Sequence, residues 1–199
     1  MKGNKNESRK GFTLIELLVV IAIIAILSVV VILTLNPAEL LRQSRDSNRI
    51  SDLSVTKSAI AFYLASVTVP SITATSSRCY VGDTVATTTC VTWFATDTDT
   101  PKVQSSTSRA VDGTGWLKIN FNSVTAGGSP LSNLPMDPLY GNGDAVHFYS
   151  YIASSTGLVF KLDAHMESAK YNASGTSDVV STDGGSDNVS YEAGSNLAL

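Results

Sequence analysis

Glu16 is an acid in an unusual place, because it lies inside residues 12–35, which are otherwise uncharged and mostly apolar. An ionised carboxylate within a membrane costs on the order of a few kcal/mol at mid-depth and less near an end. Two interpretations follow. The carboxylate either reaches the membrane interface or takes up a proton, or it pairs with a positive group that another chain supplies. Taken by itself, Glu16 favours the first interpretation.

Acidic residues also gather near the end of the chain, where Asp183 and Asp187 frame a Gly- and Ser-containing stretch. Carboxylate oxygens in such a loop are the ligands that calcium prefers. The stretch lacks the EF-hand order of ligands and the Glu that ends it, so a solvated loop is the default interpretation. Asp183 and Asp187 stand as calcium candidates, and Asp137 is either a further ligand or a turn residue.

The chain has two cysteines, Cys79 and Cys90. Outside the cytoplasm, a disulfide between them is the favoured interpretation, and it would stabilise the fold by about 2–3 kcal/mol. Two free thiols are the alternative. A metal pair is disfavoured, because no histidine lies near the cysteines in sequence and their spacing is far from that of a C-x-x-C motif.

The sequence contains none of the compact motifs that mark common enzymes, such as G-x-S-x-G, the P-loop, H-E-x-x-H or the Rossmann glycine pattern. The two histidines, His147 and His165, fall in predicted strands without a nucleophile or metal ligand at a telling spacing, so a packing or surface role is favoured. The net charge of −3, with no basic block after the first ten residues, argues against nucleic-acid binding as the main role. We therefore predict no enzyme and, calcium aside, no cofactor.

Residues 12–35 are predicted to form a membrane-spanning helix. At about 1.5 Å per residue they span roughly 36 Å, enough for a hydrocarbon core of about 30 Å. The preceding segment is basic, which favours an N-terminus in the cytoplasm and a remainder outside. A cleaved secretory signal is disfavoured, because the apolar run is too long and no A-x-A-like site follows it.

Residues 10–16 read Lys-Gly-Phe-Thr-Leu-Ile-Glu, and with the basic leader and the apolar run they resemble the processing site of type IV prepilins and type II secretion pseudopilins. The resemblance implies that a membrane aspartyl protease, the prepilin peptidase, cuts between Gly11 and Phe12 and methylates the new amine of Phe12. It also implies that Glu16 attracts the N-terminal amine of a neighbouring subunit, which reverses the preference stated above. Such a pair would also set the register between subunits.

The same resemblance implies a structural role, that of a pilin in a type IV pilus-like filament. The chain would polymerise with itself and with related pilins, and its other partners would be the prepilin peptidase, the membrane, and inner-membrane assembly machinery with an ATPase. It would begin as a single-pass precursor in the cytoplasmic membrane and end in a cell-surface filament for adhesion, motility or DNA uptake. A pseudopilin of a type II secretion system is the alternative. A non-polymerising, membrane-anchored binding domain is the second alternative.

A second, amphipathic helix is predicted over residues 36–65. Asn36 can cap it, Pro37 suits its first position, and Glu39 sits three residues after the cap. The alternative is one long helix kinked at Pro37. The apolar stripe of this helix consists of Ile50, Leu53, Ile60 and Leu64. The charged pairs expected on its solvated side are Arg42–Asp46 and Arg49–Asp52.

Residues 66–199 are predicted to be a head made mainly of strands and loops. The predicted strands are Trp116–Phe121, His147–Ile152 and Leu158–Met166, with a further strand or hairpin around Cys79–Phe94. A Gly-containing turn joins two of them into an antiparallel hairpin. Alternation along the last strand is expected to point Lys161, Asp163 and His165 outward. The acidic, Gly- and Ser-rich tail after Tyr171 is expected to be a loose surface segment.

These elements together predict an α+β protein. A long, hydrophobic N-terminal helix, kinked or restarted near Pro37, carries a small antiparallel sheet of three or four strands on its C-terminal half. The order along the chain is a leader over 1–11, the apolar helix over 12–35, the amphipathic helix over 36–65 and the head over 66–199. Residues 134–138, Leu-Pro-Met-Asp-Pro, with Tyr149 and Tyr151, resemble the P-x-D-P and Y-x-Y stretch of major pseudopilins and small pilins.

Overall fold

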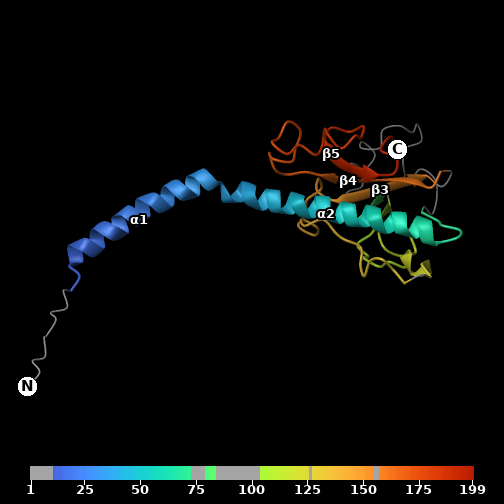
Figure 1. Cartoon of the computed structure of the whole chain (residues 1–199), viewed down its shortest axis with the longest axis horizontal. Coiled ribbons are helices and arrows are strands. Elements are labelled where there is room, and N and C mark those ends of the chain that lie inside the picture. Colours follow the sequence, from blue (N-terminus) through green and yellow to red (C-terminus); the bar gives the residue numbers. More distant parts are fainter. Residues whose placement is uncertain (1–10, 73–78, 84–103, 126, 155–156) are drawn as a thin grey trace, which may run out of the picture. The chain divides into compact units, whose positions relative to one another are not determined.

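The computed structural model describes residues 11–72, 79–83, 104–125, 127–154 and 157–199. The chain divides into two compact units, Met1–Leu40 and Leu41–Leu199. Figure 1 shows the course of the helices and strands along the chain.

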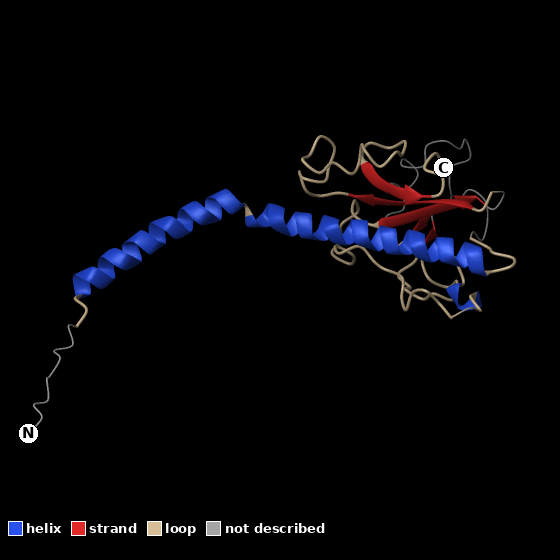
Figure 2. Cartoon of the chain, in the orientation of Figure 1, coloured by secondary structure: helices blue, strands red, loops and turns tan. Residues whose placement is uncertain are grey.

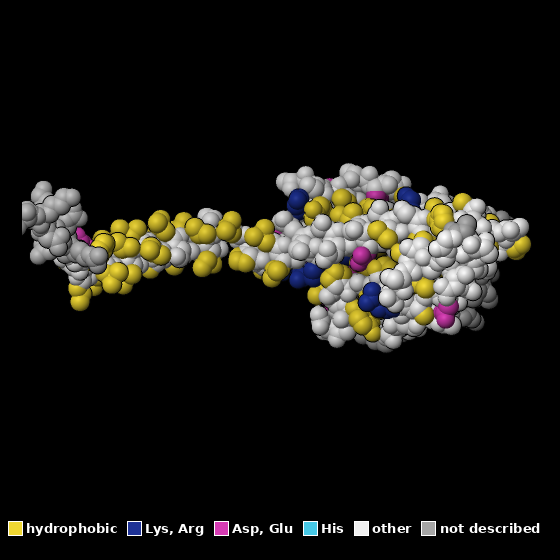
Figure 3. All heavy atoms as spheres, turned by 60° about the horizontal axis from the view of Figure 1, so that its bottom comes forward, with side chains coloured by type: hydrophobic (Ala, Val, Ile, Leu, Met, Phe, Trp, Pro, Cys, Tyr) yellow, Lys and Arg dark blue, Asp and Glu magenta, His cyan; other side chains and the backbone are white. Residues whose placement is uncertain are grey.

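Helix α1, Leu14–Leu35, fills most of the first unit. Leu, Ile and Val follow one another around its whole circumference, so it has no polar face, and every one of its described side chains is exposed. Figure 3 shows hydrophobic side chains along this helix. Among the described residues, Leu14–Ile32 is the one candidate for a membrane span, and none of it is buried. The exposed apolar surface requires either lipid or other protein around it.

Helix α2, Pro37–Ser66, begins after a break at Asn36. Asn36 adopts the left-handed conformation, with φ of 41°, and ends α1. Its carbonyl accepts hydrogen bonds from the amides of Glu39 and Leu40, and its side chain accepts one from Glu39. Asn tolerates this conformation better than most residues, and Pro37 fits the first helical position without losing a bond. The restart predicted from the sequence is therefore confirmed.

The sheet of the second unit has five strands, in the order β2-β1-β3-β4-β5 (Figure 2). The strands are β1 Tyr80–Val81, β2 Gln104–Ser105, β3 Tyr149–Ser154, β4 Val159–His165 and β5 Ser190–Gly194. The β3–β4 hairpin is confirmed, with Tyr151 opposite Leu162. The predicted small sheet, mostly antiparallel and packed on α2, is confirmed. It has five strands instead of three or four, because β5 comes from the tail, and one pair, β1 with β2, is parallel.

The core lies between α2 and one face of this sheet, and Figure 1 shows α2 running along it. The helix contributes Leu53, Ile60 and Tyr63 to this cluster. The sheet contributes Tyr149, Tyr151, Phe160 and Leu162, and all seven side chains are at most 3% exposed. The apolar stripe of α2 thus finds the sheet partner that the sequence predicted.

The strand predicted over Trp116–Phe121 is not formed. A single bridge joins Asp112 to Asn120, and a short 3-10 helix, η1 Phe121–Ser123, follows. The backbone bends instead of extending, because Gly113 has a φ of 91° and a Cβ on Gly115 would lie 2.1 Å from the Ala110 carbonyl oxygen. Apolar residues that are neighbours in sequence are therefore buried together. In a strand with one buried face this could not happen, because successive side chains point to opposite faces. The buried residues are Trp116, Leu117, Ile119 and Phe121.

The outward face of β4 is also buried. Lys161, Asp163 and His165 lie on the face away from the core, as predicted, yet they are 0%, 0% and 9% exposed. The expectation that they point into solvent was wrong. The tail contributes to this burial: it forms β5 and places Glu192 opposite Asp163. The tail is therefore not the loose segment that its composition suggested, and Val180 is fully buried in the core.

Candidate functional site: the N-terminal segment and a buried ionic network

The bond predicted for cleavage lies just outside α1. Gly11 and Phe12 are not helical, and both are exposed, Phe12 to 78%. A Cβ placed on Gly11 would meet no atom within 4 Å. An exposed, non-helical peptide bond can extend into a protease cleft without unfolding the helix behind it. The basic leader before Gly11 lies outside the described residues.

Glu16 takes part in a capping box at the start of α1. Its Oε2 accepts hydrogen bonds from the Thr13 amide at 2.9 Å and from the Thr13 hydroxyl at 2.7 Å. In return, Thr13 Oγ1 accepts the Glu16 amide at 3.3 Å. The carboxylate thus finds its hydrogen-bond partners within its own chain. The Thr-x-x-Glu spacing was the signal that would have revealed the capping box.

The capping box affects how the predicted pair between subunits can form. Its donors are neutral, so the box does not cancel the charge of an ionised Glu16 carboxylate, which could still attract a cation. The amine that cleavage would create on Phe12 adjoins Thr13, at the same end of the helix. A neighbour's amine would therefore compete with Thr13 for the carboxylate. This pairing, like the cleavage after Gly11, remains a prediction, since the structure holds a single chain.

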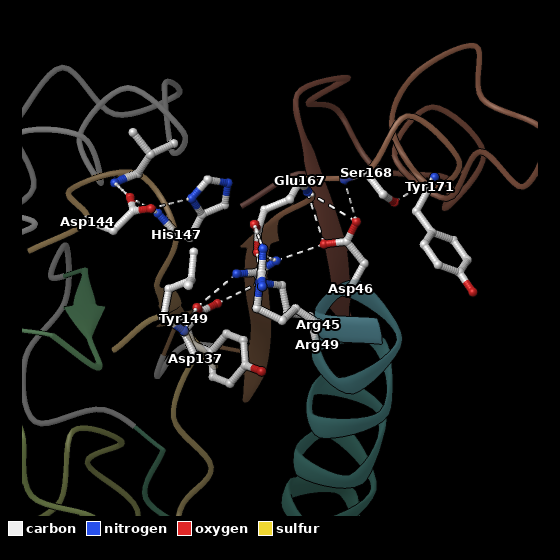
Figure 4. A network of polar contacts seen from close by, with 12 residues as sticks. Arg45, Asp46, Arg49, Asp137, Asp144, His147, Tyr149, Glu167, Ser168 and Tyr171 are labelled. Atoms are coloured by element: carbon white, nitrogen blue, oxygen red, sulfur yellow. Dashed lines mark hydrogen bonds and ion pairs between the residues drawn. The ribbon is translucent and has the colours of Figure 1, made fainter. Parts of the chain in front are cut away.

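A buried ionic network fastens α2 within the second unit (Figure 4). Arg49, whose side chain is 0% exposed, lies at its centre. Its guanidinium donates to both oxygens of Asp137, at 2.6 and 2.9 Å. It also reaches Asp46 at 2.7 Å and Glu167 at 2.5 Å. A second cation, Arg45, holds Glu167 through two hydrogen bonds at 2.8 and 2.6 Å.

Asp46 extends the network into the backbone after β4. Its carboxylate accepts the amides of Glu167, at 3.0 and 3.1 Å, and of Ser168, at 2.7 Å. The network therefore joins α2 to the turn before β3 through Asp137 and to the segment after β4 through Glu167 and Ser168. Such a buried cluster fixes the place of the helix only as long as every charge keeps its partners.

The pKa values reflect this pairing. Burial alone would raise the pKa of Glu167, but hydrogen bonds from Arg45 and Arg49 outweigh it and lower the pKa to about 2. Burial would likewise lower the pKa of Arg49, yet its bonds to Asp137 and Glu167 raise it above its ordinary value. Glu167 and Arg49 are thus both charged at neutral pH.

The charge pairing predicted along α2 was wrong in its partners and in its exposure. Arg49 pairs with Asp46 rather than Asp52, and both Arg49 and Asp46 are buried. Asp52 instead accepts a hydrogen bond from the Tyr149 hydroxyl at 2.8 Å. Charges three residues apart on a helix are usually solvated, so nothing local distinguished these from a surface pair. Asp137 was singled out only as a turn residue or ligand.

The calcium candidates serve as turn acceptors in the structure. Asp183 accepts the amides of Gly185 and Glu192, at 2.8 and 2.7 Å. Asp187 accepts the Val189 amide at 2.9 Å and the Ser190 hydroxyl at 3.0 Å. Within the described part of the chain, no group of three or more His, Cys, Asp or Glu side chains could hold a metal ion. A calcium role for Asp183 and Asp187 stays a prediction.

The remaining candidates are the cysteines and histidines. Cys79 is fully buried beside β1, and Cys90 lies outside the described residues, so their disulfide stays a prediction. His147 Nδ1 lies 2.9 Å from Asp144 Oδ2. Burial would raise the pKa of Asp144, but hydrogen bonds from His147 and Val146 lower it to about 2. Burial lowers the pKa of His165 to about 4, which makes it a neutral packing residue at pH 7.

Comparison with known families bears on the N-terminal segment. Residues 7–32 match the family described as the prokaryotic N-terminal methylation motif. The chain carries a prepilin-type methylation motif. The match includes Gly11, Phe12, Glu16 and most of α1, and it is consistent with the family of type IV pilins and pseudopilins. No curated protein and no solved structure matches the chain at a significant level.

The motif implies a prepilin-like protein that prepilin peptidase processes. Proteins of this family are normally non-enzymatic. With the apolar helix α1, the motif indicates a membrane-anchored precursor. It does not separate a pilin from a pseudopilin.

Proposed function

We propose that the protein is a structural subunit, a pilin, of a type IV pilus-like filament. One observation carries the proposal: the residues that match the prepilin-type methylation motif include most of an exposed helix that is apolar apart from Glu16, Ser28 and Thr34. The leader is removed between Gly11 and Phe12, and Phe12 becomes the methylated N-terminus. The precursor waits in the cytoplasmic membrane with its N-terminus inside, and the mature subunit joins the filament through α1.

The physics of α1 supports assembly by helix bundling. Its side chains are as apolar as lipid, so moving it from the bilayer into a bundle of like helices gains little net hydrophobic free energy. The work of extraction then comes from an inner-membrane assembly ATPase. The contact repeats in one direction without closing, and such heterologous contacts build filaments. The partners are other copies of this chain and related pilins.

Glu16 gives the bundle its register. Cleavage leaves a cation on Phe12, and a neighbour displaced along the axis brings that cation to Glu16. In a bundle of low dielectric constant, such a pair is stronger than it would be in water. A misplaced subunit would leave the amine without its acid. The Thr13 capping box satisfies the carboxylate of a subunit that has not yet assembled.

The alternative function is that of a pseudopilin in a type II secretion system. The Pro-Met-Asp-Pro stretch is compatible with both functions, since it resembles that of major pseudopilins and that of small pilins. The two functions share every feature of the N-terminal segment. A neighbouring gene for a retraction ATPase would favour the pilus, and secretin and secretion partners would favour the pseudopilus. The second alternative, an anchored binding domain, never polymerises.

Glu16→Val tests the proposal in cells that make the filament. We expect insertion into the membrane and processing to persist, while sheared filaments fall to background, because the acid that receives the neighbour's amine is gone. Glu39→Gln, which removes a carboxylate outside the apolar run, is the matched control and should leave filaments unchanged. A normal filament yield from Glu16→Val would refute the pairing of Glu16 with the amine.

A further inference from the structure

A group of polar side chains is buried on the face of the sheet opposite the core. Lys161 and Asp163 of β4 and Glu192 of β5 are at most 2% exposed. The serines Ser150 of β3 and Ser190 of β5 are fully buried on the same face. Charged residues are almost never buried so completely unless they are paired or take part in chemistry. The pilin proposal does not use this cluster.

The strand register brings the three charged residues together. Asp163 is directly opposite Glu192, and Lys161 lies two residues before Asp163 on the same face. Lys161 Nζ is 2.6 Å from Glu192 Oε1, and both side chains are 0% exposed. The amine is therefore held next to a carboxyl carbon, in a place from which bulk water is excluded.

The tail encloses the carboxyl group from the other side. The Asp187 amide donates to Glu192 Oε2 at 3.0 Å. A Cβ on Gly185 would lie 1.5 Å from that same oxygen, so only glycine permits this approach. Glu192 Oε1 thus accepts a hydrogen bond from Lys161 Nζ, and Glu192 Oε2 accepts one from the Asp187 amide. A fixed N–H at that position would also stabilise negative charge that develops on the oxygen.

Asp163 is the unexplained member of the cluster. Neither of its carboxylate oxygens has a hydrogen-bond partner among the described residues, and the same holds for Ser150 Oγ. Burial raises the pKa of Asp163 well above its ordinary value, with Lys161 opposing and Glu192 adding to the rise. The raised pKa favours the protonated form of Asp163, which lies opposite Glu192 and two residues from Lys161. A buried acid without partners destabilises a fold and is a mark of functional sites.

We propose that Lys161 and Glu192 condense into an intramolecular isopeptide bond, with Asp163 as the group that carries the proton. Transfer of one proton from Lys161 to Glu192 across their 2.6 Å contact gives the amine and the carboxylic acid that react. The Lys161 amine attacks the Glu192 carboxyl carbon, and a tetrahedral intermediate forms with the Asp187 amide on Oε2. Asp163 donates its proton to the departing hydroxyl and regains one from the nitrogen.

The balance of the reaction is one new bond from Nζ to Cδ, one broken bond from Cδ to oxygen, and one water released. Nothing is oxidised or reduced, and no co-reactant is needed. The fold supplies the effective concentration that makes such a condensation feasible between two fixed groups.

The bond would join the last strand covalently to its neighbour. Residues 161–192 would form a closed ring, and β5 could no longer be peeled from β4. A subunit that carries tension in a filament gains directly from such a link, although the chemistry itself does not depend on the pilin proposal.

Intact-mass measurement of the full chain, purified in detergent from cells without prepilin peptidase and fully reduced, tests the inference. We expect a mass lower than that of the sequence by one water, and a proteolytic product that contains both Lys161 and Glu192. Lys161→Met should show its full sequence mass. Lys170→Met, the matched control, should keep the loss of one water. A folded wild-type chain at its full sequence mass would overturn the proposal and leave a plain ion pair.

Asp163→Asn separates the role of the proton carrier from the fold. Asparagine has the size of a protonated aspartic acid, and both reacting groups remain in place. We expect a folded chain, by near-ultraviolet circular dichroism, at its full sequence mass. If the Asp163→Asn chain still lost one water at the wild-type rate, Asp163 would have no part in the chemistry.

Discussion

Replacing Arg49 by methionine should unfold the head more readily than any surface substitution. Among the residues that the structure describes, Arg49 is the one cation that contacts all three carboxylates of the network, those of Asp46, Asp137 and Glu167. Methionine fills much of the same volume and keeps the packing of the side-chain stem. It removes four hydrogen bonds and leaves buried acids that must find protons or water.

The expected magnitude follows from the burial of these groups. Breaking a buried ion pair by removing one partner costs about 3–5 kcal/mol, because the remaining charge stays in a poor environment. Without Arg49, Glu167 still pairs with Arg45, and Asp46 still accepts hydrogen bonds from two backbone amides. Asp137 is therefore the acid that the substitution destabilises most. The free energy of unfolding should therefore fall by about 3–5 kcal/mol, the cost of one broken buried pair, and not by the sum of three such costs. Arg49→Lys should lower the free energy of unfolding by less, since lysine keeps the positive charge but cannot form the bidentate hydrogen bond to Asp137.

Urea denaturation of the full chain in detergent, followed by tryptophan fluorescence, measures this loss. Trp116 is buried in the core of the head and reports its unfolding. With a slope of about 2 kcal/mol per molar urea, the midpoint of Arg49→Met should fall by about 2 M. Lys57→Met, on the exposed side of the same helix, is the matched control. Adding Asp137→Asn should restore part of the loss, because it removes the unpaired charge. A midpoint within experimental error of Lys57→Met would refute the account of the network.

Two further predictions concern processing and pH. Gly11→Leu should leave the chain folded and inserted in the membrane, since no atom lies within 4 Å of a Cβ at that position. It should block cleavage, because the larger side chain crowds the protease cleft. Gel mobility would then show only the precursor, and the appearance of mature chain would contradict this prediction. The lowered pKa of His165, about 4 when folded, means that the unfolded chain binds a proton first as pH falls below about 6.5, so stability is lost between these values. From pH 7 to pH 5, the titration of His165 should lower the urea-derived free energy of unfolding by up to about 2 kcal/mol. His165→Gln should remove this contribution. An equal drop in both proteins would argue against a role for His165 in the pH dependence.

The N-terminal features were predictable because their physics is local. Gly11, Phe12 and Glu16 lie within six residues of sequence, and the restart at Asn36 needs only Pro37 and Glu39. A helix and its caps form from neighbours in the chain. The capping role of Thr13 was equally predictable from its spacing to Glu16.

The network and the second buried face were not predictable in the same way. Arg49 meets Asp137 across 88 residues and Glu167 across 118, and no local pattern marks such partners. Alternation along β4 gave the correct sides for Lys161 and Asp163 but could not show that the tail adds a strand beside them. A charged residue in a strand usually indicates solvent, and here burial by a distant segment overrides that rule.

The mature N-terminus is the most direct test of the central claim that this chain is processed for assembly. Mass spectrometry of the protein from its native membrane or filament should find a chain that starts at Phe12 with a methylated amine. A chain that retains Met1 and the leader would contradict the claim and would favour an anchored domain that never polymerises.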